Sequence, residues 1–65
     1  MATLIKMNEV VDKTSLSRSF LYDLMKKGQF PKPCKLAVRA SAWVEAEVDE
    51  WIQSRIDARD MEELQ

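Results

Sequence analysis

Hydrophobic side chains recur with the period of an α-helix in three segments of the chain. Residues 7–13 carry three of them on one side: Met7, Val10 and Val11. In residues 17–27, four fall within an arc of about 140° at about 100° per residue: Phe20, Leu21, Leu24 and Met25. The pattern predicts two short helices that each bury one face, and residues 3–6 ahead of them suit a short strand or an extended lead-in.

The third segment, residues 45–60, has the most regular helical pattern. Its apolar stripe follows i, i+4, i+7, i+8 and i+12: Val44, Val48, Trp51, Ile52 and Ile56. Arg55 falls inside this stripe by angle, so either its aliphatic stem covers the edge of the core or the stripe has already left the core there. Residues 60–65 are expected to fray.

Two short strands, 34–36 and 41–44, are predicted between the second and third helices. The apolar residues of this stretch are Cys34, Leu36, Val38, Trp43 and Val44. The turn between the strands has no glycine, asparagine or aspartate, so the sequence does not define its type. We predict a short β-hairpin in which Cys34 is a half-buried strand residue.

The junctions between these elements carry residues typical of turns and helix ends. Ser15 or Ser17 can cap the start of the second helix. Gly28, the single glycine of the chain, stands where a left-handed residue ends a helix. Pro31 and Pro33 then exclude helix and favour extended backbone. The expected fold is therefore mainly α, with three helices plus a short β-hairpin.

Length and composition place limits on the class of protein. A chain of 65 residues forms one small domain, 1–65. No apolar run approaches the roughly 20 residues that span a bilayer, and the first residues do not resemble a signal peptide, so a cytoplasmic protein with no membrane partner is expected. One cysteine and no histidine allow neither an internal disulfide nor a Cys/His metal site, and no cofactor is expected.

Charge divides the chain into two unlike parts, although its net value is only −1. Residues 1–39 hold eight basic and three acidic side chains, a net charge of +5. Residues 40–65 hold two basic and eight acidic side chains, a net charge of −6. Such asymmetry indicates that the basic part contacts nucleic acid or a membrane surface.

The first two helices and the turn between them have the pattern of a helix-turn-helix, in which the second helix enters the major groove of DNA. On the polar side of that helix, about 17–27, Arg18 can donate two hydrogen bonds to a guanine. Ser17 and Ser19 lie at the helix start, where hydroxyls and free amides can hold a phosphate. Tyr22 can bond a phosphate or pack on a thymine methyl group.

Further cations extend this candidate surface. Lys26 and Lys27 lie near the end of the second helix and suit the DNA backbone better than the bases. Three more lie on the proline-stiffened hairpin: Lys32, Lys35 and Arg39. As a wing, at about 31–43, the hairpin can reach adjacent phosphates or the minor groove.

Three alternatives are open. The basic face can be a solvated surface that binds nothing, with Arg18 as a first-turn surface residue, Tyr22 as a packing residue, and Lys26 and Lys27 as ordinary cations near a helix C-terminus. The acidic helix 45–64 can dock on a partner protein. Catalysis is not expected and no catalytic residue is assigned, because histidine is absent and the first acidic residues of that helix suit its dipole. The charge division and the wing favour DNA binding.

The run SLSRSFLYDLMKKGQFPKP (15–33), with the downstream W…EVDEWI, resembles the AlpA family of small prophage-encoded transcriptional regulators, relatives of excisionases and of the MerR-type winged helix. The resemblance covers roughly residues 4–60 and implies a bacterial or phage protein that binds double-stranded DNA through a winged helix-turn-helix. By position, four residues correspond to the recognition helix: Ser17, Arg18, Ser19 and Tyr22. Three correspond to the wing: Lys32, Lys35 and Arg39. Five correspond to the core: Phe30, Trp43, Val48, Trp51 and Ile52.

Within that family, an activator and an excisionase-like recombination directionality factor are not distinguished by sequence, and a second protomer, RNA polymerase or integrase are the partners to consider. The chain departs from the family pattern at three places. Ser15 stands where glycine is usual, so the turn is expected to be shaped differently or slightly strained. Ala37 and Val38 stand where the wing tip often has glycine, which alters the expected tip. Phe20 stands where a smaller residue is common, and either deepens the core or offers an apolar edge to a thymine.

Overall fold

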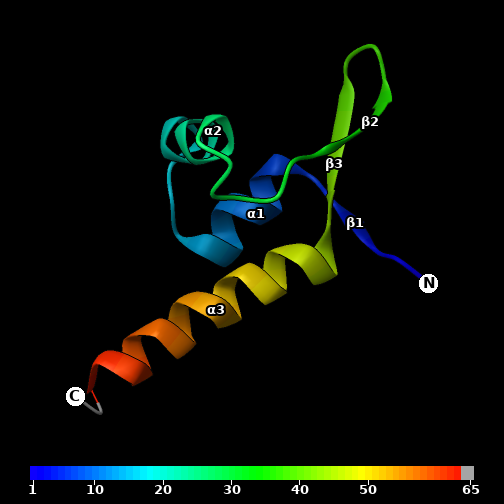
Figure 1. The fold of residues 1–65 in the computed structure, drawn as a ribbon. Coiled ribbons are helices and arrows are strands. Elements are labelled where there is room, and N and C mark those ends of the chain that lie inside the picture. Colours follow the sequence, from blue (N-terminus) through cyan, green and yellow to red (C-terminus); the bar gives the residue numbers. More distant parts are fainter. Residues whose placement is uncertain (64–65) are drawn as a thin grey trace.

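The computed structural model describes residues 1–63, which form three helices and a three-stranded antiparallel sheet (Figure 1). In chain order the elements are β1 (Leu4–Ile5), α1 (Met7–Thr14), α2 (Arg18–Lys26), β2 (Cys34–Ala37), β3 (Ala40–Val44) and α3 (Glu45–Glu63). The predicted arrangement of three helices plus a short β-hairpin is confirmed. Of the two alternatives for 3–6, a short strand or an extended lead-in, the strand is correct for Leu4–Ile5, which pair with Val44 and Trp43 of β3.

β3 is the central strand of the sheet, in the order β1-β3-β2. Cys34 pairs with Ala42 across the hairpin, and the register shifts by one residue between Lys35 and Ala37, as it does at a bulge. A bulge increases the local twist of the two strands. On the other side, the amide of Glu45 donates to the oxygen of Thr3 at 2.8 Å, so β1 holds the junction between β3 and α3.

One hydrophobic core joins the helices to the sheet. Its buried side chains are Ile5, Val10, Leu21, Met25, Phe30, Trp43 and Val48. Burying a side chain of this size stabilises the fold by about 1.5–3 kcal/mol. The core positions expected from the family resemblance are confirmed for Phe30, Trp43 and Val48, whereas Trp51 and Ile52 are partly buried at its edge.

Three small residues set the end of α1 and the two ends of α2. Ser17 caps α2, since its hydroxyl oxygen accepts a hydrogen bond from the amide of Phe20 at 3.2 Å. Ser15 ends α1 with φ 61° and ψ 22°, so a non-glycine residue stands in the left-handed conformation, which carries a steric cost for a residue with a side chain. Gly28 has φ 72°, and the amides of Gly28 and Gln29 bond back to the last turn of α2 at 3.1 and 2.8 Å.

Two side chains are more exposed than the apolar pattern predicts. Phe20 is 52% exposed, so it does not deepen the core: α2 turns Leu21 and Met25 inward and leaves Phe20 in the lining of a groove. Cys34 is exposed rather than half-buried. The reason is its position on β2, the outer strand of the hairpin, whose four residues are all exposed.

α3 runs well beyond the core. Figure 1 shows its C-terminal half leaving the other elements, and its 19 residues span about 28 Å at 1.5 Å per residue. Ile56 is 37% exposed and Arg55 is exposed, so the apolar stripe has left the core there. The predicted fraying from residue 60 is wrong for 60–63, which continue the helix, and 64–65 lie outside the described residues. Among the helices of residues 1–63, none combines the length and hydropathy needed to cross a membrane.

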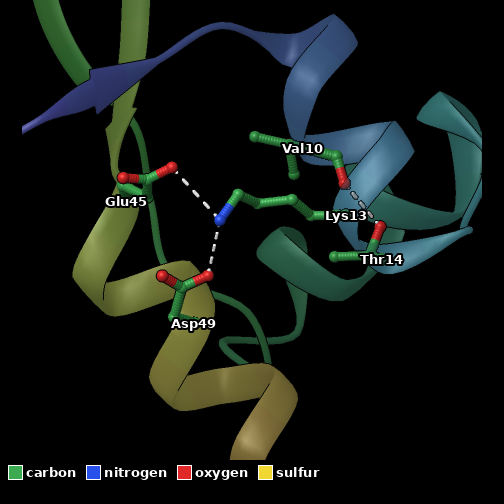
Figure 2. A network of polar contacts seen from close by, with 5 residues as sticks. All are labelled: Val10, Lys13, Thr14, Glu45 and Asp49. Atoms are coloured by element: carbon green, nitrogen blue, oxygen red, sulfur yellow. Dashed lines mark hydrogen bonds and ion pairs between the residues drawn. The ribbon is translucent and has the colours of Figure 1, made fainter.

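Lys13 connects α1 to the start of α3. Figure 2 shows its side chain reaching between Glu45 and Asp49, with its Nζ 3.1 and 2.8 Å from their oxygens. The hydrogen bond to Asp49, followed by that to Glu45, raises the pKa of Lys13 above its ordinary 10.5. Thr14 beside it donates to the oxygen of Val10 at 2.8 Å. Two of the acidic residues of α3 therefore have a partner within the fold.

Candidate nucleic-acid interface

The exposed side of α2 carries the residues predicted to read DNA. Ser19, Tyr22 and Lys26 are all exposed, Tyr22 by 56%. Their spacing of i, i+3 and i+7 aligns them along one line of the helix. Burial of Leu21 and Met25 on the opposite side fixes this orientation. The predicted outer face is thus a continuous polar strip held by the core.

Further candidate residues lie at the two ends of α2, where the strip begins and ends. The Ser17 hydroxyl oxygen is engaged in the helix cap, which leaves its O–H free to donate. Lys26 and Lys27 form the other end of the helix, and both are exposed. The Ser17 hydroxyl at one end and the two lysines at the other suit contacts with the sugar–phosphate backbone.

The hairpin carries two of the three predicted wing cations, and one of them, Arg39, lines a depression together with Arg18 of α2. Lys35 lies on β2 opposite Ser41 of β3, and Arg39 lies in the two-residue turn between the strands. Both are exposed, and Val38 at the tip is 87% exposed. In Figure 1 the hairpin and α2 project on the side of the molecule away from α3.

Lys32 is separated from this group. It lies in the loop before β2, where it lines a shallow depression with Glu47, Glu50 and Trp51 of α3. The two carboxylates there oppose the approach of a phosphate. Lys32 is therefore a weaker candidate for contact with DNA than Lys35 or Arg39.

Arg18 adopts a position that the sequence did not predict. Its guanidinium Nη2 donates a hydrogen bond to the Oδ1 atom of Asn8 on α1. Arg18 and Asn8 line one depression of about 250 Å³ together with Lys6, Arg39 and Ser41. This depression lies between the start of α2, the start of α1 and the hairpin.

Sequence analysis did not single out Lys6, Asn8 or Ser41. Lys6 contributed only to the charge count, and a lone asparagine or serine carries no pattern. Lys6 and Asn8 lie at the start of α1 and Ser41 lies on β3, and these two parts of the chain meet only in the folded protein. In the part of the chain described, ion pairs engage Lys13 and Arg59 among the basic residues, and the cations of α2 and the hairpin belong to none of these pairs.

Two short helices joined by a tight turn, a second helix with an exposed polar strip and a β-hairpin beside it together define a winged helix-turn-helix protein. The sequence agrees with this class. The chain belongs to the Prophage CP4-57 regulatory protein (AlpA) family, whose sequence model matches residues 3–56.

Two similar proteins come from a bacterium and a phage. The chain is 38% identical over 55 residues to the uncharacterised protein ORF88 of Enterobacteria phage P4, an alignment that covers 85% of this chain and 62% of the phage protein. It therefore spans less than two thirds of that relative. It is 33% identical over 58 residues to the DNA-binding transcriptional activator AlpA of Escherichia coli strain K12, covering 80% of this chain and 83% of the activator. No solved structure matches the chain.

Proposed function

We propose that this protein is a sequence-specific regulator of transcription that binds double-stranded DNA. The observation that carries the proposal is the polar strip of Ser19, Tyr22 and Lys26, all exposed on α2. In Figure 1, α2 and the cationic hairpin both lie on the side of the molecule away from α3. The similarity to a DNA-binding activator over most of both chains supports it.

In the proposed complex, α2 lies in the major groove, which has the width to admit one helix. Ser19 and Tyr22 face base edges and thymine methyl groups, and Lys26 and Lys27 contact the backbone where the helix leaves the groove. Lys35 and Arg39 bring the hairpin onto neighbouring phosphates or the minor groove. Ser17 donates to a phosphate at the start of α2.

Activation of transcription and excisionase-like control of recombination both require this module, and both remain within the proposal. A single module of this size binds weakly, so a second protomer on tandem sites, RNA polymerase or integrase is a suitable partner. A protein-interaction module that uses the acidic helix 45–64 is less well supported. Glu45 and Asp49 are paired with Lys13, and Glu47 and Glu50 lie beside Lys32.

The dependence of DNA affinity on salt tests the proposal. The logarithm of the binding constant falls with the logarithm of salt concentration by about 0.9 for each phosphate neutralised. From the number of exposed cations, we expect about four to six phosphate contacts per protomer, and so a steep slope. Absence of binding, or affinity that does not change with salt, would contradict the proposal and return attention to α3.

A further inference from the structure

We propose that the depression between α1, α2 and the hairpin binds one phosphate of the DNA backbone, with Arg18 as its anchor. This inference rests on the proposed function and assigns the ligand of one part of that interface. It differs from the guanine contact that the sequence suggests for Arg18. Three features carry it: the direction of Arg18, the charge of the lining and the role of Asn8.

Arg18 is exposed, but its side chain is directed toward α1 and not along the polar strip of α2. At about 100° per residue, Arg18 falls between Met25, which is buried, and Tyr22, which is exposed. It therefore borders the side of α2 that faces the body of the protein. As the first residue of α2, Arg18 projects beyond the core toward the helix start and meets Asn8 on α1.

The depression has the charge and the donors that suit a phosphate. Lys6 precedes α1, Arg18 begins α2 and Arg39 lies in the hairpin turn, so three separate segments bring three positive charges to the lining. Ser41 adds a hydroxyl group, and the described residues that line the depression include no carboxylate. Three cations held close together repel one another, and a bound phosphate relieves that repulsion. The depression containing Lys32 has the opposite character, because two carboxylates line it.

Asn8 is a positioning residue in this arrangement. Its side-chain oxygen engages one nitrogen of the guanidinium, and arginine has five N–H donors in a planar fork, so donors remain for a phosphate oxygen. Fixing the fork in advance reduces the entropy lost when DNA binds. The reading of bases is then left to the polar strip, chiefly Ser19 and Tyr22.

The test compares wild type, Arg18→Ala and Tyr22→Ala on a preferred duplex and on an unrelated one, over a range of salt. We expect Arg18→Ala to lower affinity for both duplexes by the same factor and to reduce the salt slope by about 0.9, the share of one phosphate. Tyr22→Ala should instead weaken the preferred duplex more than the unrelated one. A loss with Arg18→Ala that is confined to one base position, with an unchanged salt slope, would overturn the phosphate assignment and leave the proposed function standing.

A second arm locates the phosphate. Duplexes carrying a neutral methylphosphonate at one backbone position at a time are bound to wild type and to Arg18→Ala. We expect one position at which the neutral group weakens wild type but causes no further loss in the variant. In Asn8→Ala, the neutral group at that position should still weaken binding, but by less than it does in wild type. The melting temperature of each variant checks its folding.

Inorganic phosphate separates the two sources of this ligand. If the amides of Lys6, Asn8 and Arg18 shift on titration with inorganic phosphate but no methylphosphonate position couples to Arg18, the depression binds free phosphate and the assignment to DNA is overturned. If wild type binds DNA specifically, but inorganic phosphate shifts none of these amides and no methylphosphonate position depends on Arg18, the site itself is overturned. Loss of all DNA binding by wild type would instead contradict the proposed function.

Discussion

The indole Nε1 of Trp51 on α3 donates a hydrogen bond to the main-chain oxygen of Gln29, at 2.8 Å. Gln29 directly follows the glycine that ends α2. Trp43 on β3 donates in the same way to the oxygen of Pro31, at 3.1 Å. Between these two points, the ring of Phe30 packs edge-on against Trp51 with centroids 4.9 Å apart. The segment that joins α2 to the hairpin is thus held at three consecutive residues, which sets the position of the hairpin relative to α2.

Trp51 is therefore expected to be a major contributor to stability. Replacing it with alanine removes the contact with Phe30 and the bond to Gln29, and large-to-small changes of this kind cost about 3–5 kcal/mol. Because Trp51 is only partly buried, we expect a value near the lower end, enough to bring a domain of this size close to unfolding. Trp51→Phe keeps a ring against Phe30 and should lose only about 1 kcal/mol with the hydrogen bond. Urea unfolding measures both, and an unchanged midpoint for Trp51→Ala would show that the core is assigned wrongly.

Ser15 should be a site where a simple substitution stabilises the protein. Its φ of 61° places a side chain in the left-handed region, which glycine occupies without steric cost. We expect Ser15→Gly to raise the free energy of unfolding by about 0.5–1 kcal/mol. The matched control is Ser17→Ala, which removes the cap of α2 and should lower it by about 1 kcal/mol. Thermal melts that show destabilisation by Ser15→Gly would be incompatible with this conformation.

Phe20 and Leu21 are neighbours with opposite environments. Phe20 is 52% exposed and Leu21 is 0% exposed. Leu21→Ala should cost about 2–5 kcal/mol, because a cavity forms in the core. Phe20→Ser should stay within about 1 kcal/mol of wild type. Equal losses in chemical denaturation would mean that α2 is rotated from the orientation described.

The pairing of Lys13 with Asp49 and Glu45 predicts a pH dependence. These contacts raise the pKa of Lys13 in the folded protein above 10.5, so the folded state favours the charged form. The stability that they contribute is fully present below the unfolded pKa and is lost as pH rises through the folded one. The difference in melting temperature between wild type and Lys13→Met should be constant at neutral pH and shrink only above about pH 10.5. It should also be smaller than the loss with Trp51→Ala, because exposed ion pairs contribute little. A difference that disappears between neutral pH and pH 9 would argue against this network.

The parts of the fold that sequence predicts well are those set by neighbouring residues. The period of the apolar side chains gives the three helices, and the prolines give the extended segment before the hairpin. Gly28 marks the end of α2, and its start is narrowed to Ser15 or Ser17, of which Ser17 is the cap. Each of these depends on contacts within a few residues, where backbone preference and hydrophobic period point to the same structure.

The parts that sequence does not predict depend on how the elements pack. The apolar arc of α2 contains both Phe20 and Leu21. Only the orientation in which α2 packs against its neighbours decides which of these two side chains is buried. Cys34 alternates like a core residue but lies on an outer strand. The candidate site shows the same limit, because Asn8 and Arg18 meet across the turn between two helices. Pairs of this kind leave no period along the chain.

Selection from a pool of random DNA duplexes, near physiological salt, most directly tests whether α2 reads sequence. Wild type is compared with Tyr22→Ala, which changes an exposed side chain on the polar strip and should leave the fold intact. We expect wild type to enrich a short motif and Tyr22→Ala to recover that motif with at least one position blurred. Recovery of no motif by wild type, with uniform affinity for every duplex, would contradict sequence-specific recognition by this helix.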